Sequence, residues 1–240
     1  MLLDYKKAFA TVALLAAALC SEADAVSPPP RPAQLVVVEL FESQGCSSCP
    51  PANANVNALS ARSDVLTLIY GVTYWDQLGW TDTFARPEFT QRQRDYARGL
   101  GNDNVYTPQV VLNGRSDLVG ANRAELDAAV AQAATTAFTT RVVITPEGVT
   151  VGDARSHRQI AADIWLVRYD PRTLNVPIRA GENSGRTLPH VHVVRSIDRL
   201  GSWDGAERTY PIPTSRAPLH TAVLVQMRNG GPIIGAATGP

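Results

Sequence analysis

The chain has 240 residues, of which 45 % are hydrophobic and 18 % charged, and its 22 basic and 22 acidic side chains leave no formal net charge. This composition is typical of a globular protein and excludes a largely disordered chain. A neutral chain without a basic stripe offers no electrostatic footprint for nucleic acid or for an anionic membrane, so neither partner is expected.

Residues 1–25 are typical of a cleavable secretory signal peptide. Two lysines precede an apolar run over residues 8–19, and small residues at 23–25 offer a cleavage site. The apolar run is shorter than the roughly 20 residues that a membrane-spanning helix needs, so we expect no stable membrane span after signal removal. The mature protein is expected to be secreted or periplasmic, and to begin with a proline-rich tether over residues 26–34.

The chain from residue 35 to residue 139 alternates between apolar, β-favouring runs and stretches with helical spacing. Pro87 suits the first turn of a helix, Asn113-Gly114 is a strong tight-turn signal, and Asn122 is typical of a helix N-cap. The expected elements are a strand over 35–41, a helix over 51–62, a strand over 65–72, a helix over 87–100, strands over 109–112 and 116–119, and a helix after 122. This order predicts an α/β domain.

The pattern changes at residue 140, where short apolar stretches begin to alternate with turn residues. Such spacing predicts strands in an antiparallel sandwich or sheet of about 100 residues. We therefore place a domain boundary near residue 139, with a smaller, β-rich accessory domain over residues 140–240. The expected strands are 142–145, 149–151, 160–167, 191–197 and 221–227.

The turn Cys46-Ser47-Ser48-Cys49 carries two of the three cysteines, and the third, Cys20, leaves with the signal peptide. In an oxidising compartment these two cysteines have one possible disulfide. Their spacing fits a redox pair, half of a metal site or an inert crosslink. Backbone N–H groups at the start of a helix lower the pKa of a thiol, so we expect Cys46 to be the accessible nucleophile and Cys49 the shielded, resolving cysteine.

The strand that leads into the cysteine turn, the βαβ order and Thr107-Pro108 before a later strand together resemble the thioredoxin-like superfamily over residues 35–135. The resemblance implies a cis bond before Pro108, which lies against the disulfide, and backbone pairing of Thr107 with an extended substrate. It also matches Glu39 to a buried acid that accepts a proton from the resolving cysteine. An ion pair between Glu39 and an arginine is an equally open interpretation.

Longer phrases resemble a family of secreted, thioredoxin-like bacterial proteins of undetermined function. This chain departs from ordinary thioredoxins in having no tryptophan before Cys46, a Ser-Ser middle pair and a second domain. These departures favour a restricted partner over general disulfide reduction. The matching phrases are VELFESQGCSSCPPA, YWDQLGWTDTFA, YTPQVVLNG and GENSGRTLPHVHVVR.

Aromatic residues follow the second expected strand, at the end of the sheet where ligands of open α/β folds gather. Tyr74 and Trp75 are candidate substrate-binding residues for this reason. Trp80 is expected to pack beneath the long loop that contains it, as most aromatic clusters do.

His190 and His192 would share one face of a strand, a spacing that suits a metal ion. With Cys46 and Cys49 they would supply four ligands for copper or zinc. A periplasmic metal-binding protein is therefore the main alternative function. A non-enzymatic binding module with a structural Cys46–Cys49 disulfide is another.

The sequence favours an exported thiol-disulfide oxidoreductase that needs no cofactor and acts on a restricted protein or small-molecule thiol or disulfide. Cys46 exchanges with the substrate, Cys49 resolves the mixed disulfide, Pro108 shapes the groove and Glu39 moves the proton. The β-rich domain is expected to select or position the substrate. The direction of the redox reaction stays open.

Overall fold

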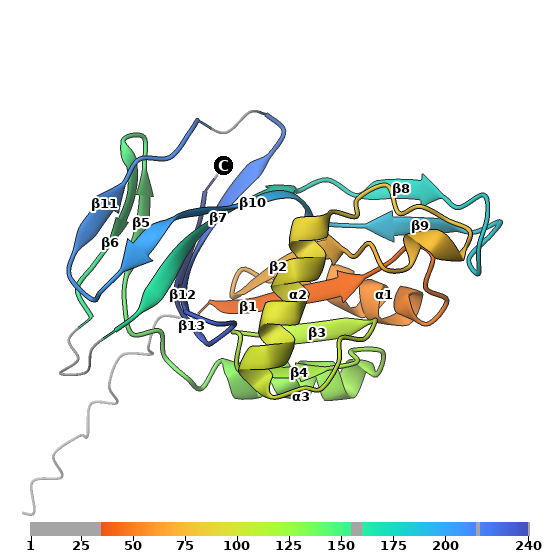
Figure 1. The fold of residues 1–240 in the computed structure, drawn as a ribbon, viewed down its shortest axis with the longest axis horizontal. Coiled ribbons are helices and arrows are strands. Elements are labelled where there is room, and N and C mark those ends of the chain that lie inside the picture. Colours follow the sequence, from red (N-terminus) through yellow and green to blue (C-terminus); the bar gives the residue numbers. More distant parts are fainter. Residues whose placement is uncertain (1–34, 155–159, 215–216, 240) are drawn as a thin grey trace, which may run out of the picture. The chain divides into compact units, whose positions relative to one another are not determined.

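A mixed sheet of eight strands forms the framework of the protein, which was studied as a computed structural model (Figure 1). The structure describes residues 35–154, 160–214 and 217–239, so the expected signal peptide and tether lie outside the described residues. The strands are β1 (Val36–Glu42), β2 (Val65–Gly71), β3 (Gln109–Leu112), β4 (Ser116–Leu118), β7 (Ala162–Asp170), β10 (Val193–Trp203), β12 (His220–Met227) and β13 (Ile233–Gly239). Their order across the sheet is β13-β12-β7-β10-β2-β1-β3-β4.

Three helices cover the part of the sheet around β1. Helices α1 (Cys49–Leu59) and α3 (Arg123–Ala133) pack on one face, and α2 (Pro87–Leu100) packs on the other, where it crosses the strands in Figure 1. Side chains alternate between the two faces along a strand. Val38 and Leu40 accordingly lie in the core beneath α1 and α3, whereas Phe41 lies in the core beneath α2.

The expected order of elements between residues 35 and 133 is confirmed. Helix α2 has the expected bounds, and the Asn122 side chain caps α3 by accepting hydrogen bonds from the backbone N–H groups of Ala124 and Glu125 at 3.0 and 3.3 Å. Helix α1 begins two residues earlier than expected, because Pro50 and Pro51 are accommodated in its first turn.

Strands from the second half of the chain join the same large sheet. Strand β10 pairs with β2 in parallel at Val193 and Ile69, and the backbone N–H of Ile69 donates to His192 O at 3.1 Å. Antiparallel pairing then adds β7, β12 and β13. The expected division near residue 139 therefore does not correspond to a break in this sheet, and the described residues cluster into one compact unit.

Two smaller sheets complete the fold. Strands β5 (Val142–Thr145), β6 (Gly148–Val151) and β11 (Arg208–Tyr210) form one of them, which shares a hydrophobic core with β7 and β12. Strands β8 (Leu174–Pro177) and β9 (Thr187–His190) form a hairpin, and β9 contacts α1. The fold is thus of the mixed α/β class. No helix among the described residues has the length and apolar character that crossing a bilayer requires.

Candidate functional site

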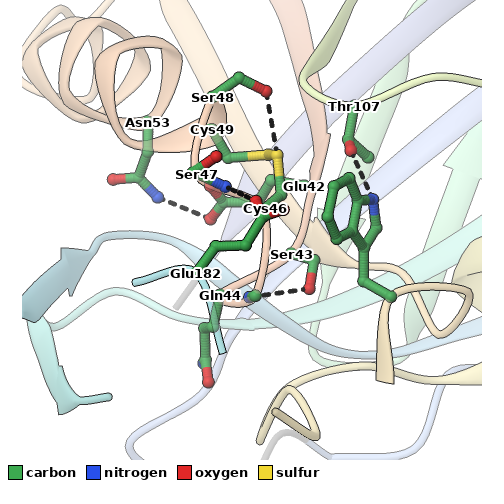
Figure 2. The surroundings of a disulfide bond; sticks show 12 residues. Glu42, Ser43, Gln44, Cys46, Ser47, Ser48, Cys49, Asn53, Thr107 and Glu182 are labelled. Atoms are coloured by element: carbon green, nitrogen blue, oxygen red, sulfur yellow. Dashed lines mark hydrogen bonds between the residues drawn. A yellow bond between two sulfur atoms is a disulfide. The ribbon is translucent and has the colours of Figure 1, made fainter. Parts of the chain in front are cut away.

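Cys46 and Cys49 form a disulfide in the turn between β1 and α1 (Figure 2). Cys49 is the first residue of α1, and Cys46 lies three residues before it. The cysteines are only 0 % and 1 % exposed, respectively, although Ser47 and Ser48 between them are exposed. The expectation that Cys46 is accessible was therefore wrong for the oxidised protein.

A remote segment, which we call the 181–186 loop, explains part of this burial. The Asn183 side-chain amide donates hydrogen bonds to the backbone oxygens of Gln44 and Cys46, both at 2.9 Å. The Glu182 carboxylate accepts a hydrogen bond from the backbone N–H of Ser47 at 3.0 Å, and Figure 2 shows this side chain reaching the turn. The loop therefore holds the cysteine turn through three backbone groups.

The start of α1 offers a Cys46 thiolate fewer backbone N–H donors than we expected from the position of the cysteine at a helix start. Pro50 and Pro51 have no N–H group, and the N–H of Cys49 donates to Cys46 O at 3.2 Å. The Ser48 hydroxyl makes no capping bond and lies 3.3 Å from Cys46 Sγ. A thiolate at Cys46 would therefore depend on this hydroxyl as well as on the helix.

A buried acid–base pair lies beside Cys49. Glu42 is the last residue of β1, is 3 % exposed, and places its Oε1 atom 2.8 Å from His190 Nδ1. The same oxygen accepts a hydrogen bond from Asn53 Nδ2 at 2.6 Å. Glu42, Asn53, His190 and Cys49 all line one pocket of about 40 Å³, enough for a water molecule. His190 Nε2 is buried and has no hydrogen-bond partner among the described residues.

Charge and burial shift the titration of this cluster. Burial lowers the pKa of His190, but Glu42, through its charge and its hydrogen bond, and the charge of Asp82 outweigh that effect, so the pKa of His190 is raised above its ordinary value. Burial also raises the pKa of Asp82 to about 6, although its carboxylate accepts backbone hydrogen bonds from Gln44 and Phe84. Negative charge near Glu42 thus favours a protonated His190.

Glu39 does not take part in this cluster. Its carboxylate is fully buried beneath α2, forms an ion pair with Arg92 at 2.7 Å and accepts a hydrogen bond from Tyr96. Burial lowers the pKa of Arg92, but the Glu39 charge outweighs this effect and keeps the pKa above its ordinary value. The arginine pairing considered for Glu39 is therefore confirmed, and the acid beside Cys49 is Glu42, which the sequence analysis missed.

The Thr107–Pro108 peptide bond is cis, as the resemblance implied. Thr107 belongs to the surroundings of the disulfide that Figure 2 shows, and its hydroxyl accepts a hydrogen bond from Trp75 Nε1 at 2.7 Å. Tyr74 donates instead to Gln93 Oε1 at 3.2 Å, and its ring packs against the core beneath α2. Trp75 is thus linked to Thr107 near the cysteines, and Tyr74 is held by Gln93 of α2 and also interacts with Thr107.

The long loop between β2 and α2, residues 72–86, makes hydrogen bonds to the residues just before the cysteine turn. The indole N–H of Trp80 donates to Gln44 Oε1 at 3.0 Å, and its Cβ lies close to Gly181 of the 181–186 loop. The backbone N–H of Gln44 donates to Asp82 at 2.7 Å, and Asp76 caps the loop by accepting from the N–H of Asp82 at 3.0 Å. Trp80 therefore has the structural role expected of it, and Asp76 stabilises the same loop.

The two histidines do not share a strand face. His190 ends β9 and faces Glu42, whereas His192 lies beyond the strand with a φ of 56°, and its Nδ1 atom lies 2.9 Å from the Thr67 hydroxyl. The turn between β9 and β10 separates them, so the four-ligand arrangement considered for copper or zinc is not formed. Within the described parts of the chain, no three His, Cys, Asp or Glu side chains are grouped to hold a metal ion.

These features define a mixed α/β protein with a buried Cys-x-x-Cys disulfide at a helix start, beside a glutamate–histidine pair. A family model described as "Protein of unknown function (DUF1223)" matches residues 37–226, and the chain belongs to this family.

Two solved structures are similar to this chain. A structural genomics target protein from Agrobacterium tumefaciens has 32 % sequence identity and a TM-score of 0.71, over 87 % of this chain and 95 % of that one. HBP35 of Porphyromonas gingivalis has 14 % identity and a TM-score of 0.58, over 86 % of this chain and 74 % of that one, which is a likeness of fold alone. The comparison with curated proteins gave no match.

Proposed function

We propose that the protein is an exported thiol-disulfide oxidoreductase, of thioredoxin-like arrangement, that acts on a restricted thiol or disulfide partner. The observation that carries the proposal is the shared pocket of Cys49 and the Glu42–His190 pair. Thiol exchange requires a group that takes a proton from the resolving thiol, and a buried carboxylate beside that thiol meets this need. Export rests on the signal-like character of residues 1–25.

A purely structural role explains the site less well. A disulfide between Cys46 and Cys49 closes a very short ring, which removes little conformational entropy from the unfolded chain. Burying Glu42 and His190 carries a desolvation cost that a crosslink does not require. The weak stabilisation by the disulfide and the desolvation cost of the pair are both understandable if the disulfide opens during function.

The proposed reaction is an exchange of two electrons and two protons between dithiols and disulfides. In the reducing direction, the Cys46 thiolate attacks a substrate disulfide, forms a mixed disulfide and releases one substrate thiolate. Cys49 transfers its proton to Glu42, and the Cys49 thiolate attacks Cys46 Sγ, which releases the second substrate sulfur. The Cys46–Cys49 disulfide forms, and the substrate leaves as a dithiol after taking up the proton held by Glu42 and the proton that Cys46 released to solvent when it ionised. The oxidising direction reverses each step.

The 181–186 loop accounts for the restricted choice of partner in this proposal. Cys46 is fully buried and its turn is held by Asn183 and Glu182, so in this proposal a substrate sulfur reaches Cys46 when these bonds to the turn open. A partner that competes for these backbone groups gains access, whereas an unrelated disulfide does not.

The reduction potential of the Cys46–Cys49 pair tests the proposal. We expect a glutathione titration of the protein to give a potential between about −270 and −120 mV, the range of known thiol-exchange proteins. Cys46→Ser serves as the control that removes the signal, and metal content is measured in the same samples. A potential below about −300 mV without bound metal would show a structural disulfide and reject the proposal.

A further inference from the structure

A second pocket lies at the opposite part of the large sheet, between the β13-β12-β7 edge and the β5-β6-β11 sheet. Its volume is about 480 Å³, within the range of pockets that bind small molecules. It shares no lining residue with the disulfide pocket. Its wall contains the apolar side chains of Ile144 and Ile212, and Arg168 contributes a cation.

Arg168 is unusual because it is 8 % exposed and yet forms no ion pair with any described carboxylate. Its guanidinium donates to the hydroxyl of Thr221 and to the backbone oxygen of Pro213. A guanidinium has five N–H donors, so these two neutral acceptors leave donors for a ligand. Burial lowers the pKa of Arg168, and Asp198, which is not among its ion-pair partners, is the one described charge that opposes this effect.

The pairing of strands explains why the Arg168 side chain lies in the wall of this pocket. Arg168 on β7 pairs with Thr221 on β12, which pairs with Gly239 on β13, so the three positions form one row across the sheet. The row ends in Gly239, which lines the pocket next to Ile144 and adds no side chain to it. A buried, unpaired charge is costly, and an anion that enters the pocket offsets the cost.

We propose that this pocket binds a small monocarboxylic acid with an apolar body. The carboxylate pairs with Arg168, which suits the planar fork of a guanidinium, and the apolar body lies against Ile144 and Ile212. A single cation matches a single negative charge, and the isoleucines favour an organic acid over a fully hydrated inorganic anion. This binding function is independent of the disulfide.

Octanoate is the probe, and its binding to the full chain is measured by calorimetry. 1-Octanol tests whether the negative charge is needed, and inorganic phosphate tests whether the apolar body is needed. We expect octanoate alone to bind, and Arg168→Gln to weaken its binding about ten- to hundredfold, as the loss of a charge-assisted hydrogen bond implies. Arg199→Gln is the matched control, because Arg199 is an arginine on neighbouring β10 that pairs with Asp163, and it should leave binding unchanged.

A second variant keeps the test decisive if Arg168→Gln does not fold. Thr238 lines the pocket and is exposed, so Thr238→Trp should fill the space and abolish octanoate binding while the circular dichroism spectrum stays unchanged. The proposal is overturned if octanoate does not bind at millimolar concentration, if 1-octanol or phosphate binds as tightly, or if a folded variant at Arg168 or Thr238 retains full affinity.

Discussion

His190 Nδ1 lies 2.8 Å from Glu42 Oε1, although 148 residues separate the two in the chain. The contact brings the end of β9 against the end of β1, and both side chains line the pocket of Cys49. Strands from the second half of the chain therefore complete the site that the first half begins. His190 thus lies in the pocket of Cys49 although no local sequence pattern connects the two residues.

Glu42→Gln tests the role of this pair in proton transfer. Glutamine keeps the size of the side chain and still accepts from Asn53, but it takes up no proton from Cys49. We expect the rate of exchange between the reduced protein and oxidised glutathione to fall about hundredfold at neutral pH, the lower end of general acid–base contributions. Stopped-flow tryptophan fluorescence measures the rate.

Glu39→Gln is the matched control for Glu42→Gln, because both acids lie on β1 and only Glu42 lines the cysteine pocket. Its exchange rate should equal that of the wild type. Equal rates for Glu42→Gln and the wild type would contradict the assignment of Glu42 as proton acceptor. A similar loss in both variants would indicate a general effect of mutating β1.

Glu39→Ala should instead destabilise the fold. The substitution leaves Arg92 as an unpaired charge that is 6 % exposed, and breaking a buried ion pair in this way costs about 3–5 kcal/mol. Urea unfolding measures the free energy, and the reduction potential is measured on the same protein. A loss smaller than about 1 kcal/mol would show that Arg92 finds another partner or water.

The sequence predicted the order of elements correctly but chose Glu39, and not Glu42, as the acid beside the cysteines. The order of helices and strands through α3 follows from hydrophobic spacing, caps and turn residues, and it is correct. Side chains of Val38, Leu40 and Glu42 share one face of β1, and α1 covers that face. Counting by two from Leu40 would have placed Glu42, and not Glu39, beside the first residue of α1.

Other parts of the site had no local signal. Asn183 lies 137 residues from Cys46, and its hydrogen bonds to the turn depend on how the β8-β9 hairpin packs against α1. Such contacts explain part of the burial of Cys46, and spacing and helix position alone, which do not include them, predicted an exposed Cys46. The turn that separates His190 from His192 likewise depends on the pairing of β10 with β2.

The raised pKa of Asp82 should make the stability of the fold depend on pH. Its pKa in the folded protein is about 6, above the ordinary value of 3.8, so the folded state binds its proton more tightly than the unfolded state does. The contribution of Asp82 is therefore greatest below pH 4 and is lost as the pH rises through about 6.

Asp82→Asn removes this titration. We expect the free energy of unfolding of the wild type, relative to the variant, to fall by roughly 3 kcal/mol between pH 3.5 and pH 7, because one pKa unit corresponds to about 1.4 kcal/mol. Urea unfolding at a series of pH values measures this difference, and the titration of groups remote from Asp82 cancels from it. A difference that is constant with pH would contradict the raised pKa.

Asn183→Ala tests whether the 181–186 loop limits access to the disulfide. The variant loses the two hydrogen bonds that Asn183 donates to the turn, at Gln44 O and Cys46 O, and the one that it accepts from Arg186 within the loop. Each of the two bonds to the turn contributes about 0.5–1.5 kcal/mol. Together the two bonds to the turn contribute about 1–3 kcal/mol, so opening of the loop should become about five- to a hundredfold more favourable. The reaction with a bulky dithiol protein should accelerate by that factor, whereas dithiothreitol, which needs a smaller opening, should gain less.

Ser184→Ala is the matched control, because Ser184 lies in the same loop and its side chain is exposed. It should react with both reductants at the rates of the wild type. The ratio of the two reductants' rates is the quantity to compare, since a general loosening of the fold raises both rates together. An unchanged ratio in Asn183→Ala would mean that the loop does not select the partner, and that the burial of Cys46 has its origin in the turn itself.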